Sequence, residues 1–296
     1  MVAMKLLLPL FLALLLAAPL HAAEPTATDV LKDLVGRQRV LLAAAEKAED
    51  AAAMEAMRPQ FQQLVYDYER YLKDYPGVAA GYVSYALLLG NPALDEQRRA
   101  GGLLLKANQL DPDQPLVKNQ LGKYLAEEGQ PLEAVNYFLA AIRLEPKEPL
   151  YHYQLGQLLT EARDDFLKSG QWNRAALDQA MHDAFAQAAA LAPDSIPYAY
   201  RYNESFYDLE KPDWDGALKA WRALEGRVAP GVEQQTIRLQ EANVLLKQAK
   251  FAEARTLLGT VDAAPLQAQK GKLLAQLPEA SLVPAPAADS VTKPGS

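Results

Sequence analysis

The chain has 296 residues, no cysteine, and 37 acidic against 30 basic side chains, which gives a formal net charge of −7. An acidic chain of this kind lacks the basic surface that nucleic-acid phosphates require, so we expect no nucleic-acid partner. Without cysteine the protein forms no disulfide, and its stability must come from its hydrophobic core.

The first residues predict export. Lys5 precedes an apolar run of about 13 residues, and small residues at Ala22 and Ala23 lead into a polar start. This order is typical of a secretory signal peptide, which we place at residues 1–22. We therefore predict a periplasmic or secreted protein with no stable membrane insertion after cleavage. An uncleaved N-terminal anchor is the alternative, although the run is shorter than the roughly 20 residues that span a bilayer.

The clearest pattern in the chain begins at Pro115. It consists of Leu121, Gly122, Leu125, Ala134, Phe138, Ala141 and Pro146. Small residues allow two helices to cross closely, large apolar ones fill the space around the crossing, and proline ends the second helix. This spacing resembles the tetratricopeptide repeat (TPR), a helix–turn–helix unit of about 34 residues.

The resemblance implies further copies, because a TPR unit leaves an apolar face that only a neighbouring unit covers. We place the clearest copies at 79–114, 115–148 and 149–195. The expected fold is all-α, a TPR-type solenoid of roughly five to six repeats over residues 23–277, of an exported bacterial type. Good helix formers dominate the composition, which agrees with this fold. The Pro/Ala-rich residues 278–296 are expected to form a disordered tail.

The repeat that starts near residue 149 contains an insertion. Phe185 follows Phe138 by 47 positions, whereas the first-helix residues recur after 34, so 13 residues are inserted around 164–173. If both helices are simply longer, Ser169 and Gly170 form the turn between them. Trp172 then needs cover from a partner or from its own hairpin.

In TPR proteins the first helices of the units line a concave groove that binds an extended peptide or a partner helix. The groove positions implied for this chain include Asn119, Lys123, Tyr153, Gln157, Arg201, Asp208, Asn243 and Leu246. Asparagine and glutamine can hydrogen-bond a peptide backbone, and Lys123 and Arg201 can hold a carboxylate. Their order differs from the family's carboxylate clamp, so no clamp is inferred.

An aromatic cluster offers a second possible partner patch. It comprises Trp172, Tyr198 and Tyr202, and it could also support homo-oligomer formation.

Catalytic motifs are missing from the sequence. There is no His-Glu-x-x-His helix, no Gly-Lys-Ser/Thr phosphate loop and no Gly-x-Ser-x-Gly elbow. We predict no enzyme, no metal and no cofactor, and a scaffold or adaptor of the bacterial cell envelope that binds a protein or peptide. An accessory subunit of an envelope enzyme or assembly machine is one alternative. A hydrolase that uses His152 and the nearby carboxylates of Glu161, Asp164 and Asp165 is another.

Overall fold

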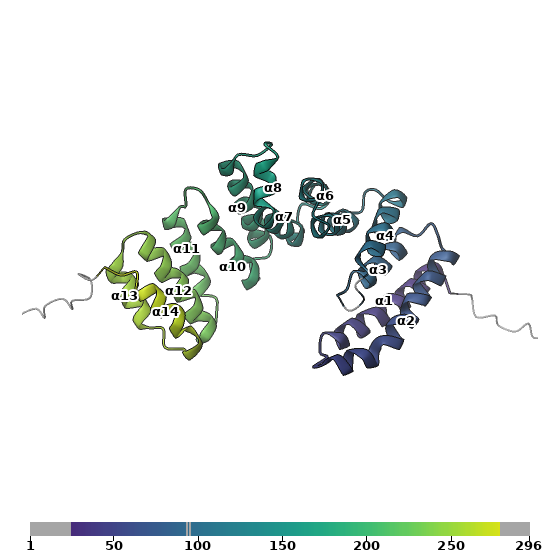
Figure 1. Ribbon diagram of the computed structural model, residues 1–296, viewed down its shortest axis with the longest axis horizontal. Coiled ribbons are helices and arrows are strands. Elements are labelled where there is room, and N and C mark those ends of the chain that lie inside the picture. Colours follow the sequence, from purple (N-terminus) through teal and green to yellow (C-terminus); the bar gives the residue numbers. More distant parts are fainter. Residues whose placement is uncertain (1–24, 93, 95, 279–296) are drawn as a thin grey trace, which may run out of the picture. The chain divides into compact units, whose positions relative to one another are not determined.

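The computed structural model describes residues 25–278 except 93 and 95, and every regular element in this part is a helix (Figure 1). The all-α prediction is therefore confirmed. The signal peptide predicted at 1–22 and nearly all of the predicted tail lie outside the described residues. Within them, no helix combines the length and apolarity needed to cross a bilayer. The chain divides into two units, residues 1–96 and 97–296, and the division falls between the two helices of the repeat expected at 79–114.

The first unit contains α1 (Ala27–Ala45), α2 (Ala51–Asp74) and α3 (Ala79–Leu89). Thr26 caps α1 in a reciprocal capping box with Asp29, which satisfies amides that the first helical turn leaves unpaired. The Tyr68 ring, fully buried on α2, stacks on Tyr85 of α3 at 5.4 Å between centroids. Aromatic packing thus joins α2 to α3 within this unit.

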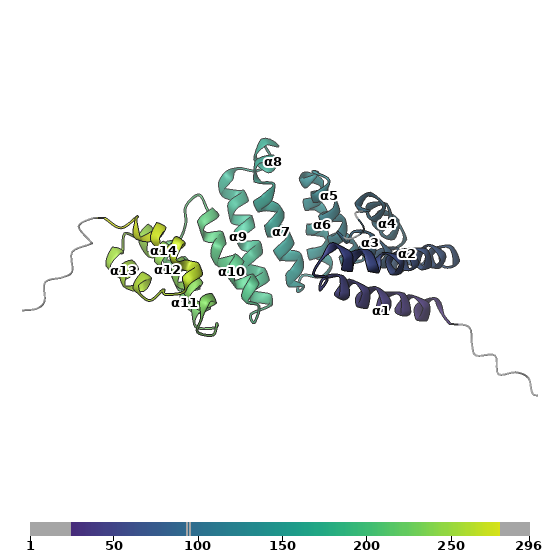
Figure 2. The same cartoon turned by 60° about the horizontal axis from the view of Figure 1, so that its bottom comes forward.

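The second unit carries most of the helices. In chain order it contains α4 (Gln97–Leu110), α5 (Pro115–Glu127), α6 (Pro131–Leu144), α7 (Pro149–Glu161), α8 (Arg163–Lys168), α9 (Arg174–Leu191), α10 (Ile196–Ser205), the 3-10 helix η1 (Phe206–Asp208), α11 (Trp214–Glu225), α12 (Val232–Lys247), α13 (Phe251–Gly259), the 3-10 helix η2 (Ala264–Leu266) and α14 (Gln267–Leu274). Apart from the short α8, each α-helix from α4 to α13 packs on the next along the chain, and α7, α9 and α10 lie side by side (Figure 2).

The helix pair α5–α6 has the structure that its sequence predicts. Pro115 and Pro131 begin the two helices, at positions where a missing N–H costs nothing. Gly129 ends the first helix with a positive φ of 73°, a conformation that glycine adopts without strain. A Cβ added to Gly122 would lie 3.0 Å from the Phe138 ring, so the two helices do meet closely at this glycine.

The insertion does not simply lengthen both helices, so the condition considered in the sequence analysis is not met. α7 ends at Glu161, and the non-helical backbone of Ala162 separates it from the short α8. Ser169 and Gly170 do form the expected turn. Trp172 is half-buried with its ring 6.1 Å from that of Phe166, which is fully buried on α8. The hairpin therefore covers its own tryptophan.

The end of the described helical stack is closed by α14. Leu266, Leu273 and Leu277 are all buried and belong to the core cluster of α11–α13. Trp221 of α11 is completely buried in the same cluster. The apolar face of α12 and α13 is thus covered by the chain itself.

We predict that Gly156→Ala destabilises the second unit. A Cβ at this position would lie 2.7 Å from the fully buried Phe185 ring, so the ring or one of the two helices must shift. The free energy of unfolding should fall by about 1–3 kcal/mol, measured by urea denaturation. Gly102→Ala is the control: it lies inside α4 with nothing within 4 Å of the new Cβ, and it should stabilise by about 0.5–1 kcal/mol. Equal stabilities of the two variants would contradict the close crossing.

Candidate functional site

Two of the residues predicted to line a groove, Lys123 and Gln157, line one pocket of about 380 Å³. We call it the acidic pocket. It lies between α5, α6, α7 and α8 and is lined by Lys123, Ala126, Glu127, Gly129, Pro131, Phe138, Gln154, Gln157, Leu158, Glu161, Ala162 and Asp165.

The acidic pocket has an apolar floor and a negatively charged rim. Phe138 and Leu158 supply buried apolar surface at its base. On the rim, Lys123 pairs with Glu127 across one helical turn, with 3.6 Å between Nζ and Oε1. Glu161 and Asp165 are exposed and form no ion pair among the described residues. The rim therefore carries more negative than positive charge, and it attracts cationic groups.

The break at Ala162 determines the shape of this pocket. Because α7 stops there, the backbone changes direction and α8 contributes Asp165 to the wall that Glu161 begins. The sequence located the insertion and its carboxylates. It did not indicate that the insertion closes one side of a pocket.

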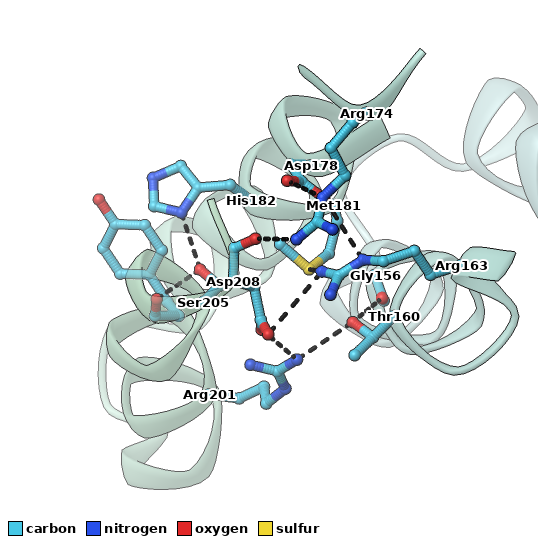
Figure 3. Close-up of polar contacts among 11 residues, drawn as sticks. Gly156, Thr160, Arg163, Arg174, Asp178, Met181, His182, Arg201, Ser205 and Asp208 are labelled. Carbon is cyan, nitrogen blue, oxygen red and sulfur yellow. Dashed lines mark hydrogen bonds and ion pairs between the residues drawn. The ribbon is translucent and has the colours of Figure 1, made fainter. Parts of the chain in front are cut away.

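Arg201, another expected groove residue, is engaged by the protein's own side chains (Figure 3). Its guanidinium lies 3.3 Å from the Asp208 carboxylate and donates to the Thr160 hydroxyl at 3.1 Å. It also covers the Phe185 ring at 4.2 Å from the centroid. A ligand carboxylate, expected from the sequence to bind Arg201, would have to displace Asp208. The charge of Arg201 is already compensated within the fold.

The ion pair between Arg201 and Asp208 belongs to a larger network that joins the insertion to the next repeat (Figure 3). Asp178 of α9, whose side chain is 1% exposed, pairs with Arg174 at 2.5 Å and with Arg163 at 3.3 Å. Arg163 also approaches Asp208 at 3.8 Å. The sequence reasoning missed this network. The spacing of Arg174 and Asp178, four residues apart beside the buried Leu177, was the available signal.

The remaining predicted groove residues are less accessible. Asn119 on α5 has no exposed surface, and its amide forms no hydrogen bond in the described part of the chain. The Tyr153 ring packs against Phe185 and Tyr198 at 5.7 and 4.9 Å between centroids. Asn243 is half-buried on α12. The structure therefore groups Lys123 with Gln157 and keeps Asn119 inside the protein.

The three residues of the predicted aromatic patch pack on different rings. Tyr198 contacts Tyr153, and Trp172 contacts Phe166. Tyr202 lies 5.1 Å from the His182 ring. All three side chains are half-buried, so each contributes to packing within its own region.

His152 makes a structural contact rather than joining a catalytic group. Its Nε2 lies 2.9 Å from the Pro146 carbonyl oxygen, six residues earlier. Tyr82 makes the equivalent contact in the first unit, donating to the Pro76 carbonyl at 3.1 Å. Glu161 lies nine residues further along α7, about 14 Å along the helix axis. His152 and Glu161 therefore do not come together as the hydrolase alternative requires.

The second histidine, His182, contacts Ser205 as in a catalytic Ser–His pair, but the hydrogen bond between them runs in the opposite direction. Its Nδ1 lies 2.7 Å from the Ser205 hydroxyl, which donates its own hydrogen to the Tyr202 carbonyl at 2.6 Å. The histidine must therefore donate to the serine, whereas a catalytic base accepts from it. Burial lowers the pKa of His182 and favours the neutral ring. Among the described residues, no His, Cys, Asp and Glu side chains form a group that could hold a metal.

Comparison with known proteins identifies the fold. No protein-family model matches the chain, and no curated protein matches its sequence. Solved structures do match. YrrB, described as a TPR protein with an unusual peptide-binding site, is 16% identical, with a TM-score of 0.56 over 69% of this chain and 96% of its own.

Two further structures cover more of the chain. PilF of Pseudomonas aeruginosa is 14% identical, with a TM-score of 0.54 over 83% of this chain and 99% of its own. PilW, described as a widely conserved type IV pilus biogenesis factor, is 17% identical, with a TM-score of 0.51 over 82% of this chain and 97% of its own. At these identities the likeness establishes the TPR fold, as the sequence predicted.

Replacing the buried amide of Asn119 tests whether this side chain belongs to the core. We expect Asn119→Leu to raise the free energy of unfolding by about 1 kcal/mol, because an unpaired polar group is replaced by an apolar one of similar size. Thermal and urea unfolding measure the effect. Asn136→Leu on the exposed face of α6 is the control and should stay within about 0.5 kcal/mol of the parent. Loss of stability in Asn119→Leu alone would indicate that the amide has a partner.

Removing Asp178 tests the ion-pair network. In Asp178→Ala, Arg163 and Arg174 lose their shared carboxylate, and we expect the free energy of unfolding to fall by about 1–3 kcal/mol. The two arginines are partly exposed and regain water, which limits the cost. Asp183→Ala, one turn further along α9 and bonded only to Gln179 among the described residues, should change stability by less than about 0.5 kcal/mol. Equal effects of the two substitutions would count against the network.

Proposed function

We propose that this protein, whose chain has the TPR fold, is a non-enzymatic scaffold or adaptor that binds a segment of a partner protein in the acidic pocket. The acidic pocket itself carries this proposal: an open cavity of about 380 Å³ with an apolar floor and a negative rim, between two successive helix pairs. It contains Lys123 and Gln157, at the first-helix positions where TPR proteins bind their ligands.

The chemistry of the acidic pocket indicates the kind of segment that it takes. An apolar side chain can bury itself against Phe138 and Leu158. A lysine or arginine beside it would meet the carboxylates of Glu161 and Asp165, which have no cationic partner among the described residues. The buried carboxamide oxygen of Gln154 has no hydrogen-bond donor in the described part, so it can accept from a peptide N–H. We infer a ligand with an apolar residue next to a basic one.

Two observations support a role in the bacterial envelope. The sequence of residues 1–22 has the order of a secretory signal peptide, which would direct the protein to the periplasm or out of the cell. PilW, one of the similar folds, is described as a type IV pilus biogenesis factor. YrrB, described as having a peptide-binding site, supports instead the binding of a peptide segment. An accessory subunit of an envelope assembly is a specific form of the same function.

The binding proposal is tested with two labelled decapeptides that share their apolar residues and differ only in carrying lysines or glutamates. Fluorescence anisotropy should detect binding of the lysine peptide and at least about tenfold weaker binding of the glutamate peptide. The double variant Glu161→Lys with Asp165→Lys should lose the lysine peptide, because the rim then repels it. Raised salt should weaken the wild-type interaction, since the rim is exposed.

The control reverses two exposed carboxylates that do not line the acidic pocket, Asp164→Lys with Asp194→Lys. This variant carries the same net charge as the test variant, so it separates the pocket from overall electrostatics. Binding lost equally in both variants, or binding indifferent to peptide charge, would remove the acidic pocket as the ligand site.

A further inference from the structure

A second pocket lies near the other end of the second unit, formed by α11, α12 and α13. Its volume is about 490 Å³, and we call it the C-terminal pocket. It is lined by Arg222, Glu241, Leu245, Ala252, Glu253, Thr256, Leu257 and Thr260. None of these residues lines the acidic pocket, so the two sites are independent.

Glu241 is the unusual group of the C-terminal pocket. It lies on α12 with 3% of its surface exposed, yet it faces a cavity. No donor group hydrogen-bonds its Oε1 in the described part of the chain, and the neighbouring Glu225 carboxylate can only share a proton with Glu241. Its other oxygen is 3.8 Å from the Arg222 Nε, which is too long for a hydrogen bond. A buried carboxylate normally has its oxygens satisfied, so this one has spare capacity for a donor.

The charges around Glu241 do not balance. Arg238 pairs closely with Glu225, at 2.6 Å. Arg222 is shared between Glu241 and Glu253, at 3.8 Å from each. Three carboxylates therefore face two guanidinium groups, and one further positive charge would neutralise the cluster. Burial, together with the adjacent Glu225, raises the pKa of Glu241 to about 7, so a proton serves in place of that charge.

The walls of the C-terminal pocket suit a compact cation on an apolar stem. Leu245 and Leu257 offer apolar surface beside the carboxylates. The Thr256 hydroxyl donates its hydrogen to the Ala252 carbonyl, so its oxygen remains able to accept. Glu241, Glu253 and Thr256 thus provide two carboxylates and one hydroxyl as acceptors for the three hydrogens of an ammonium group. A lysine side chain combines this group with a flexible four-carbon stem.

We propose that the C-terminal pocket binds the side chain of a lysine from a partner protein, with Glu241 as the buried counter-ion of its ammonium group. When the lysine binds, the ammonium replaces the proton on Glu241, and that proton passes to solvent. The site is distinct from the acidic pocket, so its existence does not depend on the function proposed there.

The test uses the purified ¹⁵N-labelled protein and NMR titration with the peptide acetyl-Gly-Gly-Lys-Gly-Gly-amide. The amide chemical shifts of the protein should change on α12 and α13. A control peptide whose lysine is acetylated on Nζ should bind at least about tenfold more weakly, because its side chain carries no charge. Equal binding of both peptides would overturn the proposal. So would equally tight binding of n-butylammonium chloride, which would assign the site to small amines instead of a protein lysine.

Substitutions identify the counter-ion. Glu241→Gln keeps the shape of the side chain and should weaken binding of the lysine peptide at least about tenfold. The control Glu233→Gln, which is exposed on the same helix, should leave the affinity for this peptide unchanged. Glu253→Gln, whose side chain is 58% exposed and which therefore threatens folding little, should weaken binding about threefold. Unchanged affinity in Glu241→Gln and Glu253→Gln, with folding confirmed by circular dichroism, would refute the assignment.

The pH dependence of binding tests whether the lysine replaces a proton on Glu241. From pH 6 to pH 8 Glu241 ionises while the lysine stays charged, so the wild-type affinity should rise about tenfold. Glu241→Gln should show no such rise. Arg222, Glu225, Arg238 and Glu253 also face this carboxyl group, and they are common to both proteins, so the difference between them reports on Glu241. An identical pH profile in both proteins would count against the exchange of proton for lysine.

Discussion

The contact between a glycine on one helix and a phenylalanine ring on the next sets the geometry of the central helix pairs. Gly122 meets Phe138 in one pair, and Gly156 meets Phe185 in the following pair. Because neither glycine carries a Cβ, the ring can lie directly against the backbone, and this proximity fixes how the helices cross. The acidic pocket opens between these two pairs, and Phe138 contributes both to the crossing and to the pocket floor. The shape of the candidate site thus follows from a packing contact.

Much of the fold could be predicted because each helix pair repeats local signals. Prolines at the helix starts, small residues at the crossings and buried aromatic residues recur from one helix pair to the next, and local spacing is what a sequence displays directly. The insertion was located but not its conformation. Beside the break at Ala162, Phe166 is fully buried and Arg163 contacts residues 15 and 45 positions away, Asp178 and Asp208. Such distant pairings leave no mark in local spacing.

The candidate site was predicted less completely, for a related reason. Lys123 and Gln157 do share a pocket, since they occupy equivalent positions on successive first helices. Arg201 occupies another predicted groove position, the one equivalent to Asn119 and Tyr153, yet Asp208 and Phe185 engage it. Position in a repeat predicts which way a side chain faces. It does not predict which charges the protein pairs internally, and Glu241 illustrates the opposite case of a buried acid left without a full partner.

The arginine network has a consequence for the acidic pocket. Arg163 begins α8, the same short helix that brings Asp165 to the pocket wall, and it is held by Asp178 of α9. The pocket wall formed by α8 is therefore held in place by the ion pair between Arg163 and Asp178, neither of which lines the pocket. A wall fixed before a ligand arrives loses little conformational entropy on binding, so affinity can come from few contacts. A preorganised wall also limits which side chains fit, because a rigid wall adapts poorly to bulkier ones.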